Sequence, residues 1–158
     1  MNAARREEAW QMQLDEQTSK SADLEAQLAD VERLANEAAT RMPKVQARHA
    51  EQLRERVQQL IGEASPVASQ DLARELAVLA DRLDVSEELT RLAAHVEHAR
   101  ELLAQEEPAG RSLDFLAQEF NREANTLGSK CNDAAVAHLV VELKGTIERL
   151  REQAQNIE

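Results

Sequence analysis

The sequence predicts an all-α protein, built from a long helical hairpin of the coiled-coil type and a C-terminal helical bundle. Ala, Glu, Leu and Arg dominate the composition, which is typical of long helices. Apolar residues recur at spacings of three and four, and we find no alternating strand pattern. Aromatic residues make up only 2% of the chain, so a core must consist of Leu and Ala layers. An elongated or oligomeric arrangement fits this better than a compact globule.

The hairpin is expected in residues 1–62. A heptad row runs along this part of the chain: Trp10, Leu14, Gln17, Ser21, Leu24, Leu28, Val31, Ala35, Ala38 and Met42. Pro43 interrupts the row because proline lacks the N–H that a helix needs. Two arrangements fit: an antiparallel hairpin turning at Pro43, which we favour, and one long kinked helix. In both, the row needs a partner helix.

Residues 63–158 are expected to form a second, helical domain. Ser69 suits the N-cap of a helix that ends near Leu83. Asp84 and Glu87 fit a capping box, which predicts a further helix from there to about Gln105.

The chain should then turn at residues 106–111, where Pro and Gly occur together. The helix after this turn should bury an apolar face containing Phe120, and Gly128 is expected to end or bend it. Asn132 or Asp133 can cap the last helix.

Charge and cysteine content narrow the function classes. The formal net charge of −11 argues against binding of nucleic acid through overall charge alone, although it is compatible with a local nucleic-acid-binding site. Cys131 is the only cysteine, which excludes an internal disulfide and points to a reducing compartment. No apolar run approaches the ~20 residues of a membrane helix, and the N-terminus lacks a signal region. We expect a cytoplasmic protein with no membrane partner.

One helix differs from the rest of the chain. Between residues 115 and 133 it carries short polar residues that are unfavourable within helices, among them Asn121 and Asn125. At 100° per residue Glu119 and Arg122 share one side, while Glu123 lies nearer the apolar stripe and should be partly desolvated. Such a face suggests an ordered polar network, an interface or a ligand site.

The preceding helix has a matching column of Glu88, Arg91 and His95. If the two helices pack antiparallel, Glu88, His95, Glu119 and Glu123 converge. Carboxylates with a histidine can hold magnesium or manganese, and a bound ion can activate water. The alternative interpretation is a salt-bridge network at a subunit contact, and the spacing leaves both open.

Three segments resemble the YicC/YloC family of bacterial proteins. They are DVSEELTRLAAHVEHARELL (84–103), LDFLAQEFNREANTLGSKCND (113–133) and VVELKGTIERLREQAQNIE (140–158). The resemblance implies a metal-dependent endoribonuclease that acts on RNA and assembles as a homohexamer around an RNA channel. Its acidic and imidazole candidates are Glu87, Glu88, Asp114, Glu119, Glu123 and His95. Its candidates for RNA contact are Arg91, Arg111, Asn121, Arg122, Asn125, Ser129 and Lys130.

Two function hypotheses follow. In the first, Glu119 and Glu123 hold a magnesium or manganese ion, Glu88 or His95 assists proton transfer, and an RNA phosphodiester is cleaved. In the second, the chain is a non-catalytic helical module for oligomerisation or RNA binding. The resemblance also implies an N-terminal domain with β-structure, opened by a motif of the SMTGFG kind, that this sequence lacks. If that domain builds part of the RNA channel, we expect a truncated or inactive form.

Overall fold

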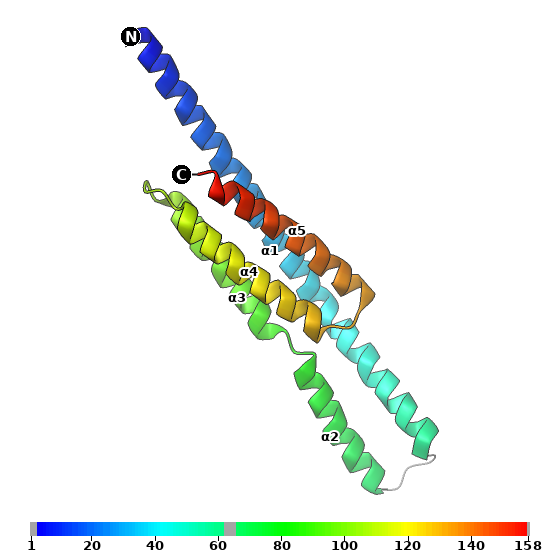
Figure 1. The fold of residues 1–158 in the computed structure, drawn as a ribbon. Coiled ribbons are helices and arrows are strands. Elements are labelled where there is room, and N and C mark those ends of the chain that lie inside the picture. Colours follow the sequence, from blue (N-terminus) through cyan, green and yellow to red (C-terminus); the bar gives the residue numbers. More distant parts are fainter. Residues whose placement is uncertain (1–2, 62–65, 158) are drawn as a thin grey trace.

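The structure, a computed structural model, describes residues 3–61 and 66–157, and these form five helices (Figure 1). The helices are α1 (Ala3–Ile61), α2 (Pro66–Arg82), α3 (Ser86–Ala104), α4 (Gly110–Lys130) and α5 (Ala134–Gln155). The described ranges contain no strand, so the prediction of an all-α protein is confirmed. None of the helices in this part of the chain combines the length and apolar character that a membrane span requires.

Helix α1 runs the whole length of the molecule and organises the fold. Helices α3 and α5 pack against its middle, α4 packs on α3 and α5, and α2 lies along the C-terminal part of α1 (Figure 1). One core joins α1 to α3, α4 and α5. Its fully buried large side chains are Leu24, Leu28, Val31, Leu34, Leu92, Val96, Leu113, Phe120, Leu127, Val136, Leu143 and Leu150. The division of the chain at residue 62 stays a prediction, and this core takes residues from both sides of it.

The favoured hairpin turn at Pro43 is wrong, and the alternative of one long helix is right. Pro43 lies inside α1, where it costs one backbone hydrogen bond. Met42 and Val45, on either side of it, are both buried in the core. Packing on both sides therefore keeps the helix continuous through the proline. The part of α1 that follows Pro43 packs antiparallel to α2.

The predicted seam is only partly packed. It is buried from Leu24 onward, but Trp10 is 65% exposed and Leu14 is 42% exposed. Residues 3–19 are all exposed and project beyond the bundle as an N-terminal arm (Figure 1). The heptad pattern predicted the buried face of this helix correctly, but it could not predict where the neighbouring helices stop.

Helix α2 begins earlier than expected. It starts at Pro66, a favourable residue for a first helical position, so Ser69 lies inside the helix and is not its N-cap. The seam between α2 and α1 is half-buried throughout and comprises Leu53, Val57, Leu72, Leu76 and Leu79.

The other helix ends agree with the sequence in part. The N-cap of α3 is Val85, which makes no side-chain cap hydrogen bond, so the capping box predicted for Asp84 and Glu87 is wrong. The Asp84 carboxylate accepts a hydrogen bond from Ser86 N at 2.9 Å, at the start of α3. The Asp133 side chain caps α5 by accepting from Val136 N at 3.0 Å, and Asp133 also pairs with Arg48 of α1. The predicted turn at residues 106–111 connects α3 to α4.

Gly128 neither ends nor bends a helix at its own position, since α4 continues to Lys130. A Cβ atom at Gly128 would lie only 3.1 Å from Val140 Cγ1. The glycine therefore allows α5 to approach α4 closely just before the chain turns between them.

Candidate functional site

Helices α3 and α4 pack antiparallel and bring four predicted residues together. Arg91 Nε donates to Glu123 Oε1 at 2.8 Å, and Arg91 Nη2 lies 3.6 Å from Glu88 Oε1. Lys130 Nζ lies 2.7 Å from the same Glu88 oxygen. We call Glu88, Arg91, Glu123 and Lys130 the Arg91 cluster.

The charges of the Arg91 cluster are arranged with the acids inside and the bases outside. The Glu88 and Glu123 side chains are 3% and 5% exposed, whereas those of Arg91 and Lys130 are 46% and 33% exposed. Carboxylates removed from water need close partners, because an unpaired buried charge is strongly unfavourable. The buried acids therefore fix the two cations at the surface of the α3–α4 contact.

The ionisation of the cluster follows from these contacts. Burial alone would raise the pKa of Glu88, but the hydrogen bond from Lys130 and the nearby charges of Lys130 and Arg91 lower it below its ordinary value. The hydrogen bond to Glu123 raises the pKa of Arg91. Glu88 is thus a carboxylate at neutral pH and not a proton donor.

His95 lies beside the cluster but faces the core. Its ring meets Phe120 edge-to-face, with centroids 5.8 Å apart. Its buried Nε2 atom and the buried Glu88 Oε2 atom both lack a hydrogen-bond partner among the described residues. The predicted role of His95 in proton transfer stays a prediction, and the structure adds an aromatic contact that the helical wheel did not show.

Glu119 and Glu123 do not fit the expected metal site as they stand. Glu123 is occupied by Arg91, and Glu119 lies 3.5 Å from Arg122 Nη1 on its own helix. Within residues 3–61 and 66–157 no three His, Cys, Asp or Glu side chains are grouped to hold an ion. Metal dependence therefore stays a prediction from the resemblance.

The remaining predicted RNA contacts do not join the cluster. Arg122, Asn121 and Asn125 are exposed on α4. Helical geometry places Asn121 and Asn125 roughly 160° from Glu123 around the helix axis, so they face away from Arg91. Arg111 is exposed at the opposite end of α4 from Lys130.

Several contacts were not predicted. Lys130 Nζ donates to the Asp84 carbonyl oxygen at 3.0 Å, and Glu87 lies 3.4 Å from Arg91 Nη1. Asp114, expected among the acidic candidates, accepts from Arg151 Nε at 3.1 Å and joins α4 to α5. Glu87 and Arg91 are neighbours four residues apart on one helix, but the contacts of Lys130 and Arg151 join distant residues through long flexible side chains, and helical periodicity carries no signal for them.

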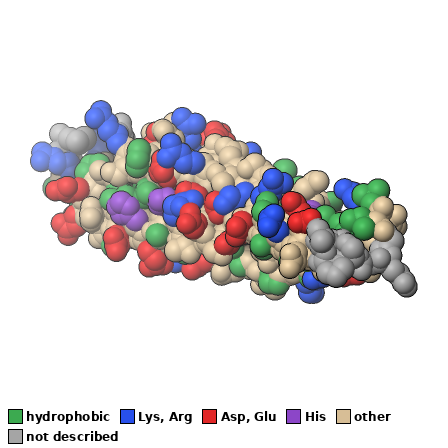
Figure 2. All heavy atoms as spheres, turned by 90° about the horizontal axis from the view of Figure 1, so that it is seen from below, with side chains coloured by type: hydrophobic (Ala, Val, Ile, Leu, Met, Phe, Trp, Pro, Cys, Tyr) green, Lys and Arg blue, Asp and Glu red, His purple; other side chains and the backbone are tan. Residues whose placement is uncertain are grey.

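A second cluster lies on the other side of α3. Arg100 donates to Glu25 at 2.9 Å, to Glu32 at 3.0 Å and to Glu97 at 3.0 Å. We call these four residues the Arg100 cluster. Figure 2 shows acidic and basic side chains interspersed on one face of the molecule, and the described residues seen there form no extended field of one sign.

Comparison with known proteins identifies the family. The family model for the C-terminal region of YicC-like endoribonucleases matches residues 38–158, which include the whole Arg91 cluster. This chain belongs to the YicC family. The family model begins inside α1, before Pro43, so residues 38–61 of this helix belong to the matched region.

Two curated YicC relatives are similar to the chain. The probable endoribonuclease YicC of Clostridioides difficile (strain 630) is 40% identical over 110 residues, covering 70% of this chain and 38% of that protein. The probable endoribonuclease YicC of Haemophilus influenzae is 48% identical over 89 residues, covering 56% of this chain and 31% of that protein. The chain thus spans less than two fifths of the length of these relatives.

Proposed function

We propose that this chain takes part in endonucleolytic cleavage of RNA. The observation that carries the proposal is that the YicC match covers every residue of the Arg91 cluster, and relatives in that match are named probable endoribonucleases. The Arg91 cluster presents two partly exposed cations in a chain whose formal net charge is −11. The proposed substrate is RNA.

Arg91 and Lys130 are the proposed phosphate contacts. Each keeps part of its side chain in solvent, and an arginine has five N–H donors, of which Glu123 takes one and Glu87 another. A phosphate could approach the outer side of the pair without breaking the inner contacts. Arg122 is exposed on α4, about 100° around the helix axis from Glu123, and is a further candidate for phosphate contact.

Glu88 and Glu123 are then positioning residues. Their carboxylates hold Arg91 and Lys130 from the buried side. Because the pKa of Glu88 is lowered, this residue cannot supply the proton that a leaving oxygen needs at neutral pH. His95 remains the candidate for proton transfer, and it would have to turn away from Phe120 to act.

The proposal includes a divalent ion, magnesium or manganese, although the described residues form no complete binding site for it. Mg²⁺ often uses only one or two carboxylates and completes its shell with water and substrate phosphates. Glu119 is the better candidate ligand, because Glu123 is already paired. If RNA cleavage by the parent chain is unchanged after chelation, metal dependence is wrong.

The test measures binding and cleavage of a labelled single-stranded RNA by the full chain. Arg91→Gln and Lys130→Gln should each weaken RNA binding about fivefold, corresponding to one lost phosphate contact. Arg33→Gln is the matched control, because Arg33 is an exposed arginine paired only along α1. Equal binding by all four proteins would remove the Arg91 cluster from the RNA surface. Cleavage that persists in Glu123→Gln would remove Glu123 from the mechanism.

A non-catalytic helical module is the second candidate. The observation in its favour is that both buried carboxylates of the Arg91 cluster are paired with cations. This candidate predicts RNA binding or self-association without cleavage. It also predicts that Arg122→Ala changes the sedimentation of the protein, whereas the first candidate predicts unchanged sedimentation and weaker RNA binding.

A further inference from the structure

The exposed side of α4 differs in charge from the exposed side of every other helix. Within the described part of the chain, α4 is the only helix whose exposed residues include no Asp or Glu. These residues combine two arginines, several uncharged polar side chains and one aromatic ring: Arg111, Ser112, Phe115, Gln118, Asn121, Arg122, Asn125 and Ser129. We call this surface the α4 face. In a chain with a formal net charge of −11, it is a place where a phosphate backbone meets positive charge.

The carboxylates of α4 lie beside this face and are paired. The side chains of Asp114, Glu119 and Glu123 are 28%, 23% and 5% exposed, whereas that of Arg122 is 73% exposed. Asp114 accepts from Arg151 Nε at 3.1 Å. The contact of 3.5 Å between Glu119 and Arg122 is a surface ion pair, a kind that contributes little stability. Arg122 therefore keeps N–H donors for a ligand that approaches from solvent.

Phe115 is 61% exposed between the two arginines of the α4 face. Helical geometry places it within about 40° of Arg111 and Arg122 around the axis, about 6 Å along the helix from the first and about 10.5 Å from the second. A single exposed phenylalanine is common and by itself indicates nothing. Among the residues of α4, all of which the structure describes, no other exposed side chain is apolar, so the apolar patch that a protein partner covers is not found there. Proteins that bind single-stranded nucleic acid use the combination present here, an aromatic ring beside cations.

We propose that Phe115 stacks on a base of single-stranded RNA, while Arg111 and Arg122 contact the phosphates on either side of that base. This role of Phe115 rests on the proposed function and adds a base contact to its phosphate contacts. The amide of Asn125, on the same side of the helix, can donate to or accept from a base edge. The short polar residues of α4 thereby gain a function that their cost within a helix does not explain.

Stacking makes Phe115 selective for the state of the strand and not for its sequence. Every base has a π-face, so the ring accepts each of them, whereas the bases of a duplex are already stacked on their neighbours. Arg111 and Arg122 alone would bind the phosphates of single and double strands alike. Phe115 is thus the residue that directs the chain to single-stranded segments of RNA.

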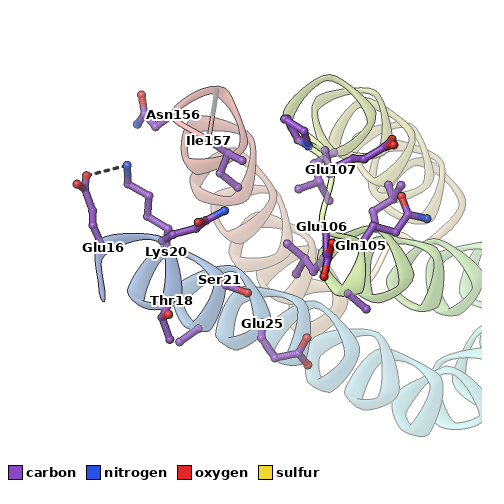
Figure 3. Close-up of a pocket in the computed structure, with 18 of the residues that line it drawn as sticks. Glu16, Thr18, Lys20, Ser21, Glu25, Gln105, Glu106, Glu107, Asn156 and Ile157 are labelled. Atoms are coloured by element: carbon purple, nitrogen blue, oxygen red, sulfur yellow. Dashed lines mark ion pairs between the residues drawn. The ribbon is translucent and has the colours of Figure 1, made fainter. Parts of the chain in front are cut away.

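A cleft elsewhere on the molecule is less suitable for RNA. This open cleft of about 840 Å³ lies between α1, the connection from α3 to α4 and the C-terminal residues (Figure 3). Figure 3 shows Glu106 and Glu107 beside it, and Lys20 on its rim is held by Glu16 at 2.8 Å. The C-terminal ends of α3 and α5 also lie here and carry partial negative charge. The cleft therefore repels phosphate groups, in contrast to the α4 face.

The first experiment measures binding of a labelled single-stranded RNA of mixed sequence to the full chain. Phe115→Ser should weaken binding about tenfold, as the loss of one stacked base does. Phe115→Leu should have the same effect because leucine is apolar but has no ring, and Phe115→Tyr should bind like the parent. Val141→Ser is the matched control and should change nothing, since Val141 is a similarly exposed apolar residue on α5. Circular dichroism should be the same for all of these variants, because neither side chain belongs to the core.

The second experiment separates stacking from phosphate contact. A strand of the same length whose ribose units carry no bases should bind the parent and Phe115→Ser equally, and so should a duplex of the original sequence. Arg122→Gln should weaken the binding of all three ligands.

Each outcome distinguishes the role of Phe115 from the proposed function. Binding of single-stranded RNA by Phe115→Ser at the parent level overturns the stacking site alone, and so does an equal loss on strands with and without bases. A parent chain that binds no RNA overturns the proposed function and the stacking site with it. Binding that depends on Phe115 without cleavage supports the stacking site and contradicts the proposed cleavage.

Discussion

The Arg91 and Arg100 clusters are built on the same helix with opposite placement of charge. In the Arg91 cluster the carboxylates are buried and the cations are partly exposed. In the Arg100 cluster the arginine is 29% exposed, while its three carboxylates are between 46% and 68% exposed. Both clusters join α3 to another helix, α4 in the first case and α1 in the second.

This difference shows which cluster depends on its partners. The carboxylates of the Arg100 cluster keep much of their water if the arginine is lost, so they contribute as ordinary surface ion pairs. Glu88 and Glu123 have no such alternative, because they are almost completely buried. We infer that the Arg100 cluster links α1 to α3 by surface ion pairs, whereas the Arg91 cluster holds its cations in fixed positions.

The largest effect is expected for Lys130→Met. This change removes the closest partner of the buried Glu88 while keeping the length of the side chain, and it should lower the free energy of unfolding by about 2–3 kcal/mol. Urea denaturation of the parent and the variant measures the difference. The double variant Lys130→Met/Glu88→Gln should recover part of it, because the unpaired charge is gone. A loss below about 0.5 kcal/mol, the usual effect of a surface change, would show that water reaches Glu88.

Arg100→Met should have a smaller effect, although Arg100 has three ionic partners. Because those carboxylates remain hydrated, we expect a loss of about 1 kcal/mol in the same urea experiment. If Arg100→Met were as destabilising as Lys130→Met, the distinction between the two clusters would be wrong.

Acid should weaken the Arg91 cluster through Glu88. Its folded-state pKa is lowered below the ordinary value of 4.5, so on acidification the unfolded chain takes up the proton first. The stabilisation from Glu88 is therefore present above about pH 5 and is lost as the pH falls through the folded-state pKa. Glu88→Gln should flatten the acid limb of stability measured by thermal unfolding. A limb as steep as that of the parent would contradict this assignment.

The sequence predicted the helices better than the relations between them. The cap of α5 was found because Asp133 acts on a backbone group three residues away, whereas the capping box predicted for α3 does not form, since its N-cap is Val85. The helix break predicted at Pro43 is absent, because the local cost of the proline is outweighed by the burial of Met42 and Val45, which local sequence does not reveal. Exposure of the N-terminal arm was likewise set by the lengths of the neighbouring helices.

The candidate site was likewise predicted only in part. Antiparallel packing of α3 on α4 brought Glu88 and Glu123 together around Arg91, as periodicity predicted. The contact of Lys130 with the Asp84 carbonyl spans 46 residues and depends on a long side chain, so periodicity could not predict it. His95 faces Phe120 because side-chain direction depends on rotamers and on the packing of the neighbouring helix.

The smallest effect is expected for Glu25→Gln, and its dependence on salt makes the comparison sharper. Glu25 is half exposed and pairs with Arg100 across α1 and α3, so its removal should cost about 0.5 kcal/mol at low salt. In 1 M salt the Debye length is about 3 Å, and the cost should vanish. The cost of Lys130→Met should persist in the same salt, because screening does not reach a buried carboxylate. Urea titrations of the parent and both variants at two salt concentrations measure these differences in the free energy of unfolding. Equal salt sensitivity of the two variants would mean that Glu88 is as hydrated as Glu25, and the cations of the Arg91 cluster would then lack a fixed support.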